Sequence, residues 1–339
     1  MTVLTKKHPP ALRPGDTIGI ITPSFPAPAR FPERYTRGIE QMKRMGFIVR
    51  EGSCTHRSEG YRSASIQERA EEFNALLRDP DVKAIISTIG GTNSNSLLPY
   101  IDYEALRRQP KIIMGYSDVT ALLLACYTQT GVTTFYGPAI VPSFGEYETM
   151  FADGERYVRE VLGLERTAPY TLDVPREWTE EMIDWSTQDR EKTFRPNDGW
   201  LTLRDGQAQG RLIGGNMNTM TGFLKSDYFP DVTGAILFLE DSFKTMADEE
   251  RSLSMLKLAG VFDVISGLVI GKHEHFDVAN APFSFEDLLL EVLGDVDFPI
   301  LTNVDIGHTF PSHVFPIGIE VELDATAGTI TFLENGVTS

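Results

Sequence analysis

The sequence is poor in cysteine, in positive charge and in long apolar runs. Its two cysteines, Cys54 and Cys126, are too few for a disulfide framework and lack metal-ligand spacing, which fits a reducing compartment. The formal net charge of −17 argues against nucleic acid and against an anionic membrane surface, because both are bound through basic patches. No run of about 18 apolar residues occurs, and residues 1–14 lack the apolar centre of a signal peptide. We therefore expect a cytoplasmic protein without nucleic-acid or membrane partners.

The first half of the chain alternates between short apolar runs and amphipathic segments. Strands are predicted at residues 17–21, 47–49, 82–88 and 111–114, and helices at residues 32–45, 66–78 and 121–130. Strands separated by helices of this length imply parallel pairing through right-handed crossovers, and so an open, doubly wound α/β sheet. Functional loops are then expected at the carboxyl ends of the strands, here at residues 22–24, residues 90–95 and the turn at Ser117.

The pattern loosens between residues 142 and 200, where all three tryptophans and much polar sequence are found. Beyond it the chain is richer in strands, which are predicted at residues 209–213, 235–239, 268–270, 319–323 and 329–332, with a helix at 247–259. With 339 residues, the chain is longer than a single domain built around one hydrophobic core usually is. We therefore predict an α/β domain over residues 1–165, a linker and substrate-binding loop over 166–200, and a smaller β-rich domain over 201–339.

The segment 112–120 has the pattern of a strand, a sharp turn and the start of a helix, with Ser117 in the turn. A nucleophile elbow has this layout: it lifts a serine hydroxyl clear of the sheet and places it beside helix N-terminal N–H groups that can stabilise an oxyanion. Gly115 lies two residues before the serine, but Val119 stands two residues after it, where the usual elbow has glycine. On local pattern alone, a buried serine that caps the following helix is an equal alternative.

A catalytic serine requires a base to accept its proton, and the base requires an orienting carboxylate. His308 is favoured among the six histidines because its loop has no periodicity that would bury it in a core. Its structural alternative is a non-catalytic histidine. His273 and His275 are spaced two residues apart without an evident third ligand, so no metal site is predicted.

Glu240 is the candidate carboxylate. It ends a predicted buried strand, where a charged side chain must either find a partner or face a cleft. Asp241 beside it suits the same task or the capping of a turn, and Asp305 is a competitor because it lies close to His308 in the sequence. The chain order serine, glutamate, histidine occurs among known triads.

Several motifs, taken in order, resemble the LD-carboxypeptidase family of serine peptidases over nearly the whole chain. These are Gly90-Gly91, Gly115-Tyr116-Ser117-Asp118, Leu212-Ile213-Gly214-Gly215-Asn216, Phe238-Leu239-Glu240-Asp241 and Gly307-His308. The resemblance implies a flavodoxin-like N-terminal domain that carries the nucleophile, a smaller β-rich C-terminal domain that supplies glutamate and histidine, a homodimer, and no metal or other cofactor. It also implies roles for five residues: Ser117 as nucleophile, His308 as general base and acid, Glu240 as orienting carboxylate, and the N–H groups of Gly91 and Asp118 as the oxyanion hole.

The tryptophan-bearing segment is similar to that of the microcin C self-immunity branch of the family, whose substrates are aminoacyl nucleotides. An aromatic side chain on a mobile loop can stack on a nucleobase, at about 1–3 kcal/mol per base. Trp185 is the first candidate for this contact and Trp178 the second, with plain packing across the domain cleft as the alternative for each. The resemblance further implies that Lys244 and Asn218 contact the substrate, although Lys244 is equally compatible with a solvated surface position.

Three functions remain open at this point. The first is a serine carboxypeptidase or amidase that hydrolyses the amide or phosphoramide-type bond of aminoacyl-nucleotide antibiotics such as processed microcin C. The second keeps the chemistry but acts on murein tetrapeptides and releases D-alanine. The third is a non-catalytic protein that binds a small ligand, since the same type of sheet serves both classes. Hydrogen-bond reach between Ser117 Oγ and a ring nitrogen of His308 would favour the enzymes.

Overall fold

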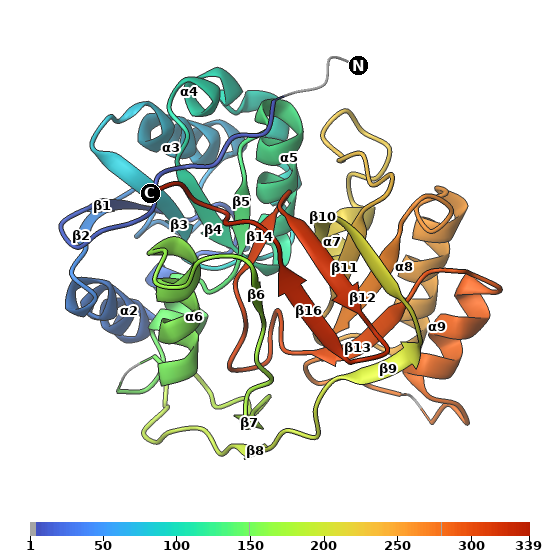
Figure 1. The fold of residues 1–339 in the computed structure, drawn as a ribbon. Coiled ribbons are helices and arrows are strands. Elements are labelled where there is room, and N and C mark those ends of the chain that lie inside the picture. Colours follow the sequence, from blue (N-terminus) through green and yellow to red (C-terminus); the bar gives the residue numbers. More distant parts are fainter. Residues whose placement is uncertain (1–4, 149, 279) are drawn as a thin grey trace.

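The computed structural model describes residues 5–148, 150–278 and 280–339, and it consists of two sheets with helices packed around them (Figure 1). The first sheet has the strand order β14-β5-β4-β3-β1-β2. Its parallel strands are β1 (Thr17–Ile21), β2 (Ile48–Glu51), β3 (Val82–Ser87), β4 (Ile112–Gly115) and β5 (Thr134–Tyr136). Strand β14 (Phe315–Ile317) comes from near the end of the chain and pairs antiparallel with β5 at the edge.

Helices cover this first sheet, and their ends follow local sequence signals. They are α1 (Ala27–Arg30), α2 (Pro32–Arg44), α3 (Ile66–Arg78), α4 (Tyr103–Arg108), α5 (Thr120–Thr130) and the 3₁₀ helices η1 (Ser94–Tyr100) and η2 (Ser117–Val119). Ser65 and Glu68 form a capping box at the start of α3. Helix α5 is apolar on nearly all sides because it is buried between the two halves, and it stops at Gly131, whose φ of 74° suits glycine.

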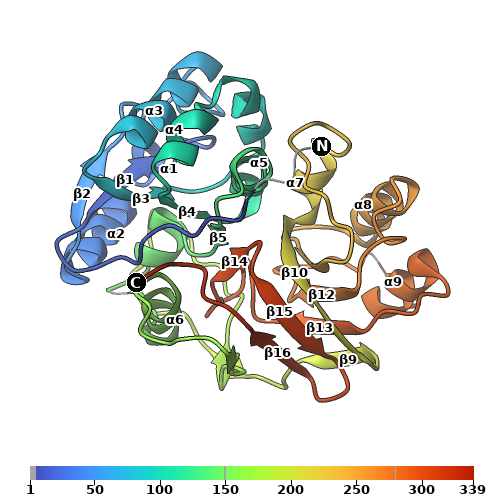
Figure 2. The same cartoon turned by 45° about the horizontal axis from the view of Figure 1, so that its top comes forward.

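The second sheet has the strand order β6-β16-β15-β10-β11-β12-β13-β9. Its parallel centre is β10 (Gln207–Asn216), β11 (Ile236–Glu240), β12 (Gly267–Gly271) and β13 (Ile300–Val304). Antiparallel strands flank it: β6 (Tyr170–Thr171), β9 (Leu201–Arg204), β15 (Glu320–Asp324) and β16 (Thr329–Phe332). Helices α7 (Met217–Thr221), α8 (Met246–Leu258) and α9 (Phe285–Leu293) accompany it, and Figure 2 shows α8 and α9 on the side away from the first sheet.

The expected fold class is confirmed, with two departures in detail. The stretch from residue 142 to 200 is more ordered than its sequence pattern indicates, because it contains part of the π-helical turn η3 (Ile140–Phe144), the helix α6 (Ala152–Leu162) and the short strands β7 (Glu177–Trp178) and β8 (Arg195–Pro196). The second half is itself of mixed α/β type rather than purely β-rich. In the part of the chain that the structure describes, no helix has both the length and the apolar character to cross a membrane.

Candidate active site

Ser117 occupies a sharp turn between strand β4 and helix α5, as an elbow requires. Its φ of 61° is unusual for a residue with a side chain and costs of the order of 1 kcal/mol, so the surroundings must hold the turn in place. The backbone N–H of Ser117 donates a hydrogen bond of 3.0 Å to Tyr136 Oη, and its carbonyl accepts one of 2.6 Å from Thr120 Oγ1. The side chain is half-buried, and Ser117 is an N-cap of neither following helix, since Tyr116 precedes η2 and Val119 precedes α5; this argues against the alternative of a helix-capping serine.

Two glycines allow the backbone to pass close to this turn. A Cβ atom on Gly90 would lie 2.9 Å from Asp118 N and 3.1 Å from Ser117 Oγ. A Cβ atom on Gly115 would lie 2.4 Å from Ser87 Oγ and 2.8 Å from a methyl group of Val119. The valine side chain therefore fills the space that Gly115 leaves open, and this packing accounts for the departure from the usual elbow sequence.

The loop at Gly91 approaches the nucleophile turn from the neighbouring strand β3. No protein acceptor for the N–H groups of Gly91 and Asp118 is found within the described residues, so both donors are available to a ligand. The carboxylate of Asp118 accepts 2.9 Å hydrogen bonds from the N–H groups of Asn93 and Ser94, and thereby ties this loop to the turn. Ser24 Oγ accepts a further bond of 3.1 Å from Thr92 N. Sequence reasoning missed this use of the Asp118 side chain.

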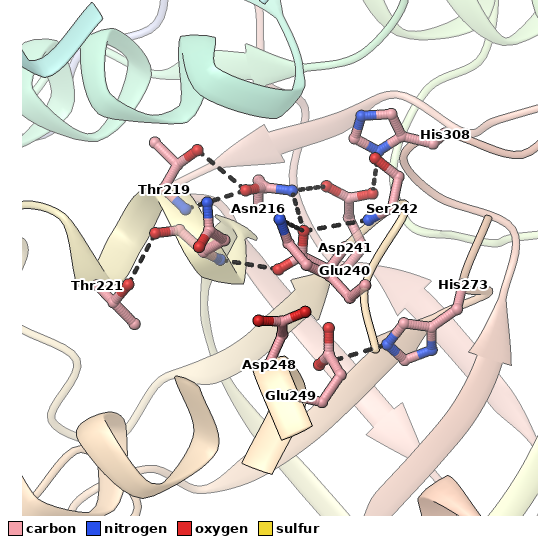
Figure 3. Close-up of polar contacts among 12 residues, drawn as sticks. Asn216, Thr219, Thr221, Glu240, Asp241, Ser242, Asp248, Glu249, His273 and His308 are labelled. Atoms are coloured by element: carbon pink, nitrogen blue, oxygen red, sulfur yellow. Dashed lines mark hydrogen bonds and ion pairs between the residues drawn. The ribbon is translucent and has the colours of Figure 1, made fainter. Parts of the chain in front are cut away.

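Glu240 and His308 form a buried ion pair in the second half of the chain (Figure 3). Glu240 Oε2 lies 2.6 Å from His308 Nδ1, and Glu240 is the last residue of β11. Burial alone would lower the pKa of His308, but the adjacent Glu240 carboxylate outweighs it and raises the pKa to about 9. Gly307 permits the close approach, because a Cβ atom there would lie 2.1 Å from Glu240 Oε2, and its φ of 90° also favours glycine.

The carboxylate of Glu240 has two further donors. Tyr136 Oη donates to Oε1 at 2.5 Å, and Asn216 Nδ2 donates to the same oxygen at 3.1 Å. Asn216 is paired with Glu240 in the register of β10 and β11, so the ends of two parallel strands bring these groups together. Burial would raise the pKa of Glu240, but the positive charge of His308 and these hydrogen bonds lower it below its ordinary value. Glu240 is therefore held as a carboxylate.

The nucleophile turn and the ion pair adjoin across the two halves. The ring of Tyr116, the residue before Ser117, lies 4.8 Å from the ring of His308 between centroids. Within the described residues, Ser117 Oγ and His308 make no hydrogen bond with each other, so the expected contact is not formed in this state. Catalytic hydrogen bonds are often long before substrate binds, and the geometry leaves His308 Nε2 as the ring nitrogen that faces away from Glu240.

Asp305, the other candidate for orienting His308, makes its hydrogen bonds with different residues. It is fully buried, accepts hydrogen bonds from Lys272 Nζ at 2.8 Å and Trp200 Nε1 at 2.9 Å, and is also bonded by Asn197 Nδ2. These contacts join the end of the 166–200 segment to the loop that carries His308. Of the two carboxylates that the sequence left in competition, Glu240 is the one that contacts the histidine.

Asn218 and Lys244 both lie beside Asp241, immediately after Glu240 in the chain. The N–H of Asn218 donates to Asp241 Oδ2 at 2.9 Å, and Lys244 Nζ lies 3.9 Å from Oδ1. Burial, reinforced by the nearby Glu249, raises the pKa of Asp241 to about 7. Asn218 and Lys244 are half-buried, and both lie against the residue that follows Glu240 rather than on a remote surface.

The two candidate tryptophans have different surroundings. The Trp185 ring lies under the guanidinium of Arg34 at 4.8 Å and packs edge-on against Phe31 at 5.2 Å, which puts it against the first domain. The Trp178 ring instead lies close to two cations, Arg195 at 3.9 Å and Lys272 at 5.4 Å. The two rings therefore serve different contacts in this state.

A buried polar cluster holds the segment that carries Trp185. Gln188 hydrogen-bonds to both Arg34 and Glu146, and Lys192 Nζ lies 3.5 Å from Glu146 Oε2. Arg34 also donates 2.7 Å to Glu146 in an ion pair that is almost wholly shielded from solvent. Sequence reasoning missed this cluster, because its members are spread over more than 150 residues and share no local pattern.

The histidines outside the ion pair have structural contacts. His273 Nε2 lies 3.5 Å from Glu249 Oε2, as Figure 3 shows, and His275 stacks on Phe243. Among the described residues, no group of three or more histidine, cysteine or acidic side chains has an arrangement that could bind a metal ion.

Family profiles match both halves of the chain. The LD-carboxypeptidase N-terminal domain matches residues 18–137, and the LD-carboxypeptidase C-terminal domain matches residues 209–323. The chain belongs to the LD-carboxypeptidase family. This LD-carboxypeptidase is a hydrolase of the serine carboxypeptidase type, which confirms the expectation from its motifs and argues against a non-catalytic ligand-binding protein.

Relatives resemble this LD-carboxypeptidase over almost its full length. A Vibrio cholerae protein named as a carboxypeptidase is 49% identical, with 93% of this chain and 94% of the relative covered. The microcin C7 self-immunity protein MccF of Escherichia coli is 42% identical, with 98% of each covered. A Bacillus subtilis protein named as a murein peptide carboxypeptidase is 29% identical, with 97% and 95% covered.

Solved structures of MccF share the fold of this LD-carboxypeptidase. A complex with aspartyl sulfamoyl adenosine superposes with a TM-score of 0.94 at 41% identity, covering 98% of this chain and 100% of that one. A complex with glutamyl sulfamoyl guanosine gives 0.93 at 41% identity, covering 98% and 99%. A variant described as an active-site mutant, in which a serine, an asparagine and a lysine are replaced by alanine, gives 0.94 at 40% identity, covering 98% and 100%.

Proposed function

We propose that this protein hydrolyses the amide bond between the aminoacyl group and the nucleotide part of aminoacyl-nucleotide antibiotics such as processed microcin C. The observation that carries the proposal is the buried Glu240–His308 pair beside the strained Ser117 turn, because this is the set of groups that acyl transfer requires. The likeness to a microcin self-immunity protein supports the choice of substrate.

In the proposed reaction, Ser117 Oγ attacks the carbonyl carbon while His308 accepts the hydroxyl proton. Glu240 holds the imidazole in the required tautomer and stabilises its charge. The N–H groups of Gly91 and Asp118 bind the negative oxygen of the tetrahedral intermediate. His308 then protonates the leaving nitrogen, and a water molecule that His308 deprotonates hydrolyses the ester to Ser117.

Four side chains are proposed to bind the nucleotide part and its linkage. Trp185 is the first candidate to stack on the base and Trp178 the second, and Asn218 and Lys244 contact the polar linkage beside the ion pair. The proximity of Asn218 and Lys244 to Asp241 supports this assignment. The same three residue types, serine, asparagine and lysine, are replaced in the variant of MccF that is described as an active-site mutant.

A murein tetrapeptide is the second candidate substrate, with D-alanine as the product. It is favoured by the 29% identity to a protein named as a murein peptide carboxypeptidase over 97% of this chain. Both substrates would use the same nucleophile and base. They differ in whether an aromatic ring is needed to hold a nucleobase, so the effect of changing Trp185 separates them.

The test compares wild-type protein with Ser117→Ala and with Ser254→Ala, a control on the half-buried face of α8. Each is incubated with an aminoacyl sulfamoyl adenosine and with a tetrapeptide that ends in D-alanine, and amino-acid release is measured. We expect wild-type and Ser254→Ala to cleave the nucleotide substrate much faster than the peptide, and Ser117→Ala to cleave neither while still binding. Undiminished hydrolysis by Ser117→Ala would rule out the serine mechanism.

We further propose that the protein acts in the cytoplasm as a homodimer. The scarcity of cysteine supports the first point, and both cysteines are free and buried. The second rests on the family resemblance of the motifs. Light scattering of the purified protein at micromolar concentration would show a single species of twice the chain mass if the proposal holds.

A further inference from the structure

Tyr136 bridges the two groups that the proposed reaction takes from different halves of the chain. Its phenolic oxygen accepts the 3.0 Å hydrogen bond from the N–H of Ser117 and donates the 2.5 Å hydrogen bond to Glu240 Oε1. Glu240 Oε2 then contacts His308 Nδ1 at 2.6 Å. A continuous series of three hydrogen bonds thus connects the nucleophile backbone to the base.

The direction of each bond in this series is fixed by chemistry. A backbone N–H can only donate, so the phenol oxygen must accept from Ser117 and is left with its own proton for Glu240. Burial, followed by the negative charge of Glu240, raises the pKa of the Tyr136 phenol well above its ordinary value, so the phenol keeps that proton. The phenol therefore acts as a fixed donor and a fixed acceptor at once.

The ring is held in place on several sides. Tyr136 is 1% exposed, and its ring packs against Phe238 on β11 at 5.4 Å and against Tyr116 at 6.4 Å. In the sheet it is paired with Gly115, two residues before the nucleophile, and on its other side with Phe315. A rigid phenol at this point sets the spacing between the Ser117 turn and the Glu240 carboxylate.

We propose that Tyr136 is a positioning residue for catalysis: it holds the strained Ser117 turn in register with Glu240, and it moderates the charge that Glu240 presents to His308. The inference rests on the proposed function, since it assigns Ser117, Glu240 and His308 to one reaction. Tyr136 touches neither the scissile bond nor the leaving group in this scheme. Its effect is exerted through the Ser117 backbone and the Glu240 carboxylate.

Removing the hydroxyl has a predictable effect on the base. The acidic groups that act on His308 are Glu240 on β11, Glu274 after β12, and Asp241. Without the Tyr136 donor, the charge of Glu240 is less satisfied by hydrogen bonds and attracts the imidazolium proton more strongly. The acid limb of the kcat/KM profile, which reports deprotonation of the base, should therefore move to higher pH.

The variant Tyr136→Phe tests the proposal, because it deletes the hydroxyl and keeps the ring. We expect kcat to fall by roughly tenfold to a hundredfold, the range for losing a hydrogen bond to a charged group, with KM changed by no more than about twofold. We also expect the upward shift of the acid limb. Tyr103→Phe is the matched control, since it removes a hydroxyl that donates to Leu98 O and takes no part in the Ser117–Tyr136–Glu240 series, and it should leave kcat and the pH profile unchanged.

A second substitution should shift the acid limb in the opposite direction. Because it keeps the hydroxyl group, it also separates the proposed effect from a loss of folding. Incorporation of 3-fluorotyrosine at position 136 keeps the hydroxyl but makes it a stronger donor, so the acid limb should move to lower pH. An unchanged limb in both position-136 variants, with Ser117→Ala inactive, would overturn the role of Tyr136 alone. Retained activity of Ser117→Ala would instead overturn the proposed function on which it rests.

Discussion

Glu240 and His308 are 68 positions apart in the chain, yet Glu240 Oε2 and His308 Nδ1 are separated by 2.6 Å in a buried contact. The contact uses one ring nitrogen and leaves the other free to act on Ser117. It also sets the proton affinity of the imidazole, because a carboxylate beside a buried histidine stabilises the charged form. The first two predictions follow from this pair.

Replacement of Glu240 by glutamine should keep the shape of the side chain and remove its charge. We expect kcat to fall by roughly ten-thousandfold, the order found when the carboxylate of a serine protease triad becomes an amide, because the imidazole loses its preferred tautomer. Steady-state hydrolysis of the aminoacyl nucleotide gives the measurement. Glu40→Gln, an exposed substitution on α2, is the matched control and should be fully active. A decrease of only a few-fold in Glu240→Gln would contradict the triad.

The acid limb of the kcat/KM profile should lie at unusually high pH. The pKa of His308 is raised to about 9, so the protonated and inactive form dominates at neutral pH in the free enzyme. We expect kcat/KM to rise about tenfold per pH unit below that value and to level off above it. Profiles measured between pH 6 and pH 10 at constant ionic strength test this. A plateau that already begins near the ordinary histidine pKa of about 6.5 would contradict the influence of Glu240.

Alanine at Gly91 should disrupt the oxyanion loop. The φ of 148° there is unfavourable for a side chain, and the new Cβ would lie 2.2 Å from Ser24 Oγ, so the loop must shift. We expect kcat to fall by roughly a hundredfold to a thousandfold, as for the loss of one oxyanion donor. Gly60→Ala is the control: its φ of 71° is also positive, but the new Cβ meets open space. It should cost about 1 kcal/mol of stability and leave kcat intact.

The two tryptophans should differ in their effect on nucleotide affinity. Trp185→Ala removes the ring proposed to stack on the base and should weaken binding by roughly 5- to 150-fold. Trp178→Ala should have a smaller effect, since the Trp178 ring already contacts the side chains of Arg195 and Lys272. Calorimetric titration of adenosine monophosphate into each variant, in the Ser117→Ala background, provides the comparison. Equal losses would show that the segment acts through its folding rather than through one ring.

The sequence was most informative where a local pattern coincides with a whole element. The predicted strand at residues 17–21 and the helix at residues 66–78 match β1 and α3 at both ends, because apolar runs and capping residues mark them. Helix α6 was overlooked although its inward residues, Tyr157, Val158, Val161 and Leu162, have helical spacing. The strands β5 and β14 have three residues each, which is too short for any periodicity to be recognised.

Some residues of the candidate site have a recognisable sequence pattern, and others do not. Ser117, Glu240 and His308 could be predicted because each stands at the end of an apolar run or in an irregular loop and belongs to a family motif. Tyr136 could not, because a tyrosine in a short buried strand has the pattern of an ordinary core residue. Its hydroxyl gains a function only when β11 is packed beside β5, and that is a property of the tertiary structure.

Strand β14 has a consequence for how the polypeptide can be divided. Residues 315–317 complete the edge of the first sheet, although they follow the whole second sheet apart from its last two strands. A fragment that ends near residue 165 would expose the edge of β5 that β14 covers in the whole protein. A fragment that begins near residue 201 would contain β14 without the strand it pairs with. Splitting the gene at the linker should therefore yield two insoluble pieces, with recovery only when both are made together in one cell.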